Sequence, residues 1–138
     1  MSITVAELMT TDVITLPADA TIGEAMGVLA ETEYRHLPML DEGRVVGMLS
    51  DRDLRRIEGL MALAVEDPAK TQEVLDQPAA SLLSGEPVTI EGDASVAHAI
   101  DILVRERVGA LLVVDGAGML TGMLSYIDIL EAARASFE

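Results

Sequence analysis

One segment of the chain occurs twice, and this repeat limits the possible folds more than any other feature of the sequence. Residues 6–54 match residues 80–129 at an offset of 74 residues, which becomes 75 after one extra residue in a loop of the second copy. The tetrapeptide Gly-Met-Leu-Ser, for example, occurs at residues 47–50 and again at 122–125. A copy of about 50 residues buries little core by itself. We therefore expect the two copies to pack through their sheets into one module with pseudo-twofold symmetry.

The sequence patterns of both copies predict the same order of elements, β-α-β-β-α. The predicted fold class is therefore α/β. A short helical turn and a brief strand, at residues 13–16 or 87–90, come first, and apolar residues at spacings of three and four then indicate an amphipathic helix. In the first copy that helix begins with the capping box Thr21-x-x-Glu24. Two apolar runs follow, separated by a hairpin turn, and a last helix begins at the serine of the repeated tetrapeptide. The predicted domains are repeat 1 at residues 1–58, a helical connection at 59–78 and repeat 2 at 79–138.

The composition limits the kinds of partner that the chain can bind. Its 24 acidic and 9 basic side chains give a net charge of −15, which opposes binding to nucleic acid and to anionic membranes. Two tyrosines and one phenylalanine are too few for a platform on which bases stack. The chain has no cysteine, and it has no apolar run of the roughly 18 residues that a membrane-spanning helix needs. We expect a cytoplasmic protein with no disulfide, no membrane insertion and no thiolate-bound metal.

The residues that follow each predicted amphipathic helix resemble a known family. The first copy reads Tyr-Arg-His-Leu-Pro-Met-Leu-Asp at residues 34–41 and Gly-Arg-Val-Val-Gly-Met-Leu-Ser-Asp-Arg-Asp-Leu at 43–54. The second copy reads Gly-Ala-Leu-Leu-Val-Val-Asp at 109–115 and Gly-Met-Leu-Ser-Tyr-Ile-Asp-Ile at 122–129. Both copies resemble the cystathionine-β-synthase-type (CBS) domain. The chain as a whole therefore resembles a free-standing pair of CBS domains.

This resemblance implies a regulatory module without catalytic activity. Pairs in this family bind an adenosine-containing ligand (AMP, ADP, ATP or S-adenosylmethionine) in the cleft between the two repeats. The ligand is a regulatory signal, for example of the energy state of the cell, and not a required cofactor. The resemblance also implies a homodimer, and we expect the regulated protein to be a separate chain. The alternative is a ligand-free structural or dimerisation module that acts on a partner protein by contact alone.

The resemblance assigns ribose contacts to the Ser-x-x-Asp motif at the junction of the last strand and the last helix. The matching residues are Ser50 with Asp53, and Ser125 with Asp128. A carboxylate suits this role because its two oxygens can accept hydrogen bonds from two neighbouring ribose hydroxyls. The same spacing also resembles a helix capping box, in which the acid binds back to the residue before the helix. Both interpretations stand, and one motif can serve both roles.

Phosphate contacts fall, by resemblance, at Arg35 and His36, and Arg52 is a third candidate. Residues 35–56 contain five arginines against four acids, so all of the net negative charge lies elsewhere in the chain. The second copy has glycine and alanine at the positions of Arg35 and His36. We therefore expect the better site to be composite and to join Ser125 and Asp128 to Arg35 and His36. The alternative role for the arginines is in surface ion pairs with neighbouring acids.

The first strand of each copy is where the family forms the slot for the adenine ring. The candidates are Val13, Ile14 and Val88, whose alternative role is ordinary sheet core. Of the two histidines, His98 has no second ligand at a spacing typical of metal sites, and the alternative role of His36 is that of a hydrogen-bonded residue at the start of a strand. No arrangement of residues indicates a nucleophile or a phosphate-binding loop. We therefore expect neither a catalytic site nor a metal site.

Overall fold

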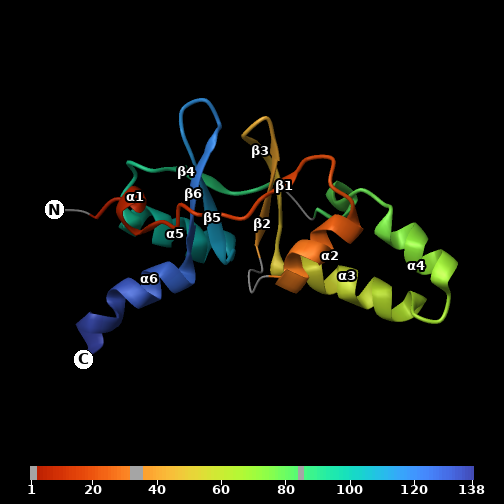
Figure 1. The fold of residues 1–138 in the computed structure, drawn as a ribbon. Helices are drawn as coiled ribbons and strands as arrows, with labels where there is room; N and C mark the ends of the chain where they lie inside the picture. The colour runs from red at the N-terminus through yellow and green to blue at the C-terminus, as the bar shows by residue number, and fades with distance from the viewer. Residues whose placement is uncertain (1–2, 32–35, 84–85) are drawn as a thin grey trace. The chain divides into compact units, whose positions relative to one another are not determined.

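The structure is a computed structural model that describes residues 3–31, 36–83 and 86–138 (Figure 1). These residues form two compact units, each built around one three-stranded sheet. Unit 1 contains the chain up to residue 13, residues 43–45 and residues 87–138, and unit 2 contains residues 14–42 and 46–86. Among the described residues, no helix is long and apolar enough to cross a membrane.

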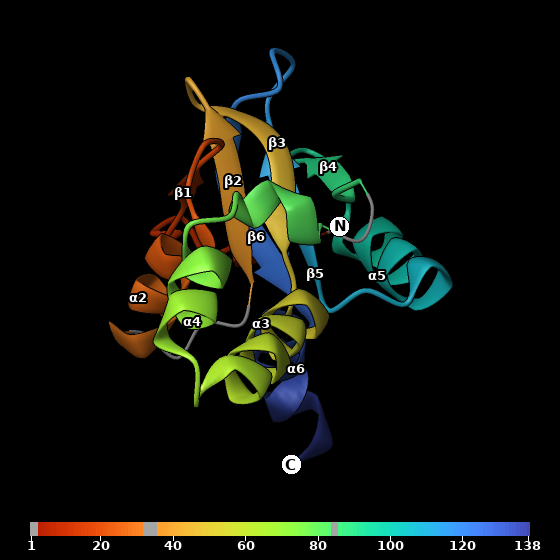
Figure 2. The same cartoon turned by 90° about the vertical axis from the view of Figure 1, so that its right-hand side faces the viewer.

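Unit 2 combines a sheet with three helices. Its elements are β1 (Leu16–Pro17), α2 (Ile22–Glu31), β2 (Leu37–Asp41), β3 (Arg44–Leu49, whose first two residues belong to unit 1), α3 (Asp51–Ala64), α4 (Pro68–Leu75) and the 3-10 helix η1 (Ala79–Leu82). The strand order is β1-β2-β3, and β1 runs parallel to β2 with Leu16 opposite Met39. Helix α4 packs against both α2 and α3, as Figure 2 shows.

The turn between β2 and β3 has the tight geometry that the sequence predicts for a hairpin. Its two central residues, Glu42 and Gly43, have φ angles of 51° and 85°. Positive φ at both positions is the geometry whose twist matches two adjacent strands. Glycine adopts it without steric cost, which explains the residue at position 43.

Unit 1 repeats the same plan. Its elements are α1 (Val5–Leu8), β4 (Thr89–Glu91), α5 (Val96–Glu106), β5 (Ala110–Val114), β6 (Leu120–Ser125), α6 (Tyr126–Ala133) and the 3-10 helix η2 (Arg134–Phe137). The strand order is β4-β5-β6: β4 is parallel to β5, and β5 is antiparallel to β6, with Leu111 opposite Leu124. Helix α5 packs against β5, and α1 contacts α5, α6 and β6.

Each unit has its own hydrophobic core. The core of unit 2 consists of Leu16, Ala20, Ile22, Ala25, Leu37, Met39, Leu49, Leu54, Ile57, Ala79 and Leu82. The core of unit 1 consists of Val5, Ile90, Ala99, Leu103, Leu111, Val113 and Leu124. In α2 and α5 the buried residues Ile22, Ala25, Ala99 and Leu103 follow the predicted three-and-four spacing, which places apolar side chains on one helical face. Ile100 has the same spacing but is 41% exposed.

Each copy begins with a short lead-in segment, which contains α1 in the first copy and η1 in the second. Each lead-in segment packs with the other copy of the repeat. In unit 1, the backbone N–H of Val5 donates to the carbonyl oxygen of Ala94 at 2.8 Å. In unit 2, the N–H of Ile22 donates to the carbonyl oxygen of Gln77 at 2.9 Å, and Ala79 is fully buried in the core. Each compact unit therefore differs in its boundaries from the copy that sequence similarity defines.

The α/β class and the presence of two β-α-β-β-α copies are confirmed. The segment between the repeats contains the end of α3, which extends to Ala64, and α4 at Pro68–Leu75. The domain boundaries stay a prediction. The first strands are shorter and begin later than the predicted residues 13–16 and 87–90, because only Leu16–Pro17 and Thr89–Glu91 pair with a neighbouring strand. The packing of the two copies through their sheets stays a prediction.

Candidate ligand site at the strand-to-helix junctions

The first Ser-x-x-Asp motif lies where β3 ends and α3 begins. Ser50 is the residue before α3, and its backbone N–H donates to Oδ2 of Asp53 at 2.9 Å. The hydroxyl of Ser50 lies 3.0 Å from the same Oδ2. The motif therefore forms a capping box, which satisfies part of the unpaired polar backbone at the start of the helix.

The other oxygen of Asp53 distinguishes this motif from a simple cap. Asp53 is only 1% exposed, and its Oδ1 is buried without a hydrogen-bond partner among the residues that the structure describes. A buried polar atom without a partner costs about 1–3 kcal/mol of free energy, and more where the group is charged. A hydroxyl or amide group that donated to Oδ1 would remove this cost.

The second motif lies at the junction of β6 and α6 and has a different set of contacts. The backbone N–H of Ser125 donates to Oδ2 of Asp128 at 2.9 Å, and the N–H of Asp128 donates to the hydroxyl of Ser125 at 3.2 Å. The Thr10 hydroxyl donates to Oδ1 of Asp128 at 3.3 Å. Asp128 is half-buried, unlike Asp53. Sequence reasoning missed Thr10, because it lies 118 residues from Asp128 along the chain and no local pattern links them.

Two of the three candidate phosphate contacts lie in the described part of unit 2, and Arg35 lies outside the described residues. His36 is half-buried just before β2, and this burial lowers the pKa of its imidazole, an effect that the negative charge of Asp51 partly offsets. Asp51 also forms an ion pair with Arg55 at 2.7 Å. The side chain of Arg52 is exposed near the start of α3. The arginine-rich segment thus contains a surface ion pair between an arginine and a neighbouring acid, which is the alternative role for these arginines.

The three candidates for the adenine slot are divided between the two units. Ile14 packs against the core of unit 2, and Val88 packs against the core of unit 1. Val13 is half-buried and belongs to unit 1. The core role is therefore observed for Ile14 and Val88, and contact of any of the three with a ligand stays a prediction.

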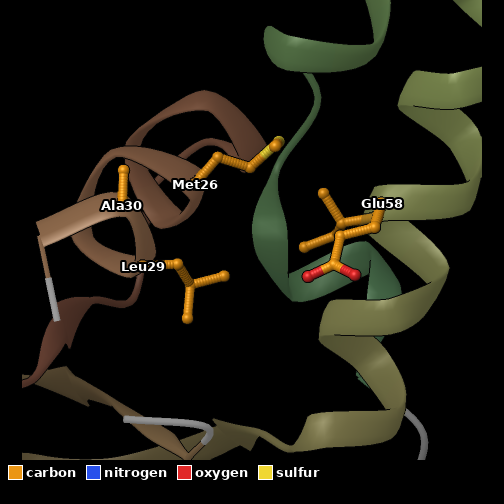
Figure 3. Close-up of a pocket in the computed structure, with 5 residues that line it drawn as sticks. Met26, Leu29, Ala30 and Glu58 are labelled. Atoms are coloured by element: carbon orange, nitrogen blue, oxygen red, sulfur yellow. The ribbon is translucent and has the colours of Figure 1, made fainter. Parts of the chain in front are cut away.

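A pocket of about 230 Å³ lies between α2 and α3, and its lining includes no residue of either Ser-x-x-Asp motif. Its lining consists of Met26, Leu29 and Ala30 of α2 with Ile57 and Glu58 of α3. Figure 3 shows Met26 and Leu29 on one side of the pocket and Glu58 on the other. The apolar lining does not provide the positive charge that a phosphate requires. Within the described ranges, no group of three or more histidine, aspartate or glutamate side chains could hold a metal ion.

The fold and the paired motifs define a class of tandem-repeat α/β proteins with one Ser-x-x-Asp junction in each repeat. The CBS domain family model matches residues 5–59 and residues 79–135. The chain therefore belongs to the CBS domain family.

Two relatives differ in how much of their own length matches this chain. The chain is 30% identical over 132 residues to a CBS domain-containing protein of Dictyostelium discoideum, covering 95% of this chain and 91% of the relative. It is 31% identical over 129 residues to the inosine-5′-monophosphate dehydrogenase of Methanocaldococcus jannaschii. That match covers 93% of this chain but spans only 23% of the dehydrogenase.

Two solved structures share the fold over almost the whole chain. The crystal structure of CBSX2 in complex with AMP has a TM-score of 0.78 at 22% identity and covers 98% of each chain. The CBS domain pair of protein MJ0100, in complex with 5′-methylthioadenosine and S-adenosyl-L-methionine, has a TM-score of 0.76 at 20% identity and covers 99% of each chain. At these identities the likeness shows the fold alone.

Proposed function

We propose that the chain is a non-catalytic regulatory module that binds an adenosine-containing ligand through its two Ser-x-x-Asp junctions. The observation that carries the proposal is the unpartnered oxygen of Asp53, which is buried at the start of α3. A helix cap needs only one oxygen of the carboxylate, and Asp53 already uses Oδ2 for that purpose. The second oxygen accepts no hydrogen bond from the described residues, so a ligand hydroxyl that reached it on binding would satisfy it.

Ribose is the group that we propose for this contact. Its vicinal hydroxyls are two donors close together, and a carboxylate has two acceptor oxygens at a matching separation. An adenosine-containing ligand is supported by the two solved structures with the same fold, because CBSX2 is in complex with AMP and MJ0100 is in complex with methylthioadenosine and S-adenosylmethionine. We propose AMP, ADP, ATP or S-adenosylmethionine as the class, bound as a regulatory signal and not as a cofactor.

The phosphate of a nucleotide would require the arginine-rich segment of the first repeat. We propose that Arg35 and His36 contact the phosphate of a ligand whose ribose is held by Asp128, and that Arg52 adds positive charge near Asp53. Arg35→Ala and Asp128→Ala should then weaken the same binding event, and their effects should not add. Coupling of Arg35→Ala to Asp53→Ala instead would mean that each site lies within one repeat.

The regulated protein would be a separate chain in the cytoplasm, and the module itself would be a homodimer. The match to a segment of inosine-5′-monophosphate dehydrogenase supports a role beside an enzyme, because that segment is a minor part of a longer protein. Exposed apolar side chains on α5 and α6, such as Val104 and Leu130, support association with a second copy.

A ligand-free structural module is the second candidate. The capping boxes at α3 and α6 favour it, because both are complete without a ligand. In that case Asp53 and Asp128 would serve only to begin their helices.

Isothermal titration with AMP, ATP and S-adenosylmethionine separates the two candidates. We expect the unmodified chain to bind at least one of them, and Asp128→Ala to weaken one binding event by roughly tenfold or more, the usual cost of losing a charged hydrogen bond. Glu24→Ala is the matched control, because it removes the acid of the capping box at α2 and lies outside the proposed site. No heat signal from any of the three ligands at millimolar concentration would favour the structural module.

A further inference from the structure

Thr10 is held firmly in unit 1 beside the second Ser-x-x-Asp motif. Its backbone N–H donates to the carbonyl oxygen of Met123, and its carbonyl oxygen accepts from the N–H of Met123, both at 2.9 Å. The preceding residue, Met9, passes directly over Gly122, where a Cβ atom would lie 2.6 Å from the Met9 sulfur. The position of Thr10 is therefore fixed by the backbone and does not depend on its own hydroxyl.

The contacts of Asp128 leave acceptor capacity on both of its oxygens. The N–H of Ser125 occupies one position on Oδ2, and the Thr10 hydroxyl occupies one position on Oδ1. A carboxylate has about four acceptor positions, two on each oxygen. Among the described residues, one acceptor position on each oxygen thus has no partner, and the two bonds together limit rotation of the carboxylate.

Asp53 has the opposite distribution. Both contacts with Ser50 fall on Oδ2, and the buried Oδ1 has no hydrogen-bond partner in the described parts of the chain. Its free acceptor positions are therefore concentrated on one oxygen. The two motifs share a sequence pattern, but within residues 3–31, 36–83 and 86–138 only Asp128 has a hydroxyl from a distant segment on its second oxygen.

We propose that Thr10 is a positioning residue that makes the Asp128 site selective for a vicinal diol. The Thr10 contact of 3.3 Å is longer than a strong O–H···O bond, so it orients the carboxylate while leaving it free to accept further bonds. The fixed carboxylate presents one acceptor on each oxygen, which matches the 2′- and 3′-hydroxyls of ribose. A deoxyribose has only one of these donors and would leave one acceptor unused. This inference rests on the proposed binding of an adenosine-containing ligand.

The experiment compares AMP with 2′-deoxy-AMP by isothermal titration. Asp128→Asn first identifies which binding event belongs to Asp128. For that event we expect AMP to bind roughly tenfold or more tightly than 2′-deoxy-AMP, the ratio typical of one charge-assisted hydrogen bond. Thr10→Val keeps the shape of the side chain but removes the hydroxyl, and it should reduce this ratio to about threefold or less, because a carboxylate free to rotate no longer holds both acceptors toward the diol.

Two further variants separate the hydroxyl from other effects. Thr10→Ser keeps the hydroxyl but removes the methyl group, and it should keep the ratio of the unmodified chain. A role that depended on the shape of the side chain would instead be kept in Thr10→Val and lost in Thr10→Ser. Thr11→Val removes the neighbouring, exposed hydroxyl and should leave the ratio unchanged. Thermal denaturation of each variant establishes that it is folded, and Thr10→Ser provides the test if Thr10→Val does not fold.

The outcomes distinguish this inference from the proposed function. If AMP binds but the ratio is near one in the unmodified chain, or is unchanged in Thr10→Val, the positioning role is wrong while nucleotide binding stands. If none of AMP, ATP and S-adenosylmethionine binds to the unmodified chain, the proposed function is wrong and the inference is wrong with it.

Discussion

At the scale of single residues, the glycine of the repeated Gly-Met-Leu-Ser tetrapeptide has the same structural role in both copies. A Cβ atom on Gly47 would lie 2.5 Å from a methyl carbon of Leu83. A Cβ atom on Gly122 would lie 2.6 Å from the Met9 sulfur and 2.9 Å from the carbonyl oxygen of Thr10. Each glycine therefore lets a lead-in segment pass directly over the last strand of a sheet. The repeat in the sequence reflects a repeated backbone contact.

Gly122→Ala should destabilise the protein by about 1–3 kcal/mol, the usual cost of forcing a methyl group into a packed region. Movement of the Met9 side chain cannot relieve the clash fully, because a backbone oxygen is also in the way. Gly116→Ala is the matched control, since nothing lies within 4 Å of a Cβ atom there and its φ is not positive. Chemical denaturation measures both free energies of unfolding. Equal stabilities of the two variants would contradict the close approach at Gly122.

His36 should make the folded state less stable in acid. Burial lowers the pKa of His36 below its ordinary value of 6.5, although Asp51 partly opposes this shift. As the pH falls through 6.5, the unfolded chain takes up a proton that the folded chain does not yet bind, so the free energy of unfolding decreases until the lower folded pKa is passed. We expect His36→Gln to lose less stability than the unmodified chain between about pH 7 and pH 5.

The control for this prediction is His98→Gln, which removes the exposed histidine of α5. Its stability should follow that of the unmodified chain across the same pH range. A parallel pH profile for His36→Gln and the unmodified chain would mean that burial of His36 does not influence folding.

Local sequence patterns predicted the residue contacts that lie within one turn of a helix. The capping boxes at Ser50 and Ser125 follow from a spacing of three residues, and the structure contains both. The contact between Thr10 and Asp128 could not be predicted in this way, because it depends on the tertiary path of the N-terminal segment. The unpartnered oxygen of Asp53 is likewise a consequence of burial and not of spacing.

At the scale of elements, the sequence predicted the types of helices and strands better than their partners. Apolar periodicity located α2 and α5 because one face of each helix is buried in its own unit. The strand β1 is only two residues long, since its pairing with β2 is confined to Leu16 and Pro17. A run of apolar residues indicates which part of the chain is buried. The length of a strand depends instead on how many of its residues pair with the neighbouring strand.

The lead-in segments show the same limit more clearly. The short helix α1 buries Val5 completely in the core of unit 1, with the second copy of the repeat. The pattern of apolar residues in α1 would be identical if it packed on the first copy. Sequence similarity therefore identifies the repeats, but contacts decide which segments fold together.

At the scale of the whole molecule, exposed apolar side chains on α5 and α6 predict association with a second copy. Val104 is 71% exposed and Leu130 is 59% exposed, and α5 and α6 also expose Ile100, Tyr126 and Ile127. A gathering of such side chains into one patch would favour an interface with another protein. Light scattering at micromolar concentration should give about twice the chain mass of 14.6 kDa. Introducing charge by Val104→Glu together with Leu130→Glu should reduce the mass to that of one chain.

The matched control for the dimer is Ala69→Glu, which adds a charge at an exposed position in the first turn of α4. A glutamate there is compatible with the helix dipole, so it should change neither the fold nor the mass. A mass of one chain for the unmodified protein at every concentration would rule out the homodimer.

The two compact units also predict which fragments can fold. Residues 1–58 form the first repeat by sequence similarity, but this fragment lacks Ala79 and Leu82, which are buried in the core of unit 2. It also leaves Val5 without the unit 1 residues that bury it. Residues 14–86 retain the backbone hydrogen bonds from Ile22 to Gln77 and from Ala79 to Ala20, both at 2.9 Å. The second fragment is therefore the more complete folding unit.

We expect residues 14–86 to unfold cooperatively on heating, at a lower temperature than the full chain, because a domain this small has a marginal core. Residues 1–58 should show no cooperative transition as a monomer. Circular dichroism during thermal denaturation, with light scattering to establish the mass, tests both fragments against the full chain. A cooperative transition from monomeric residues 1–58, with none from residues 14–86, would mean that sequence similarity defines the folding unit and that the lead-in segments contribute little to stability.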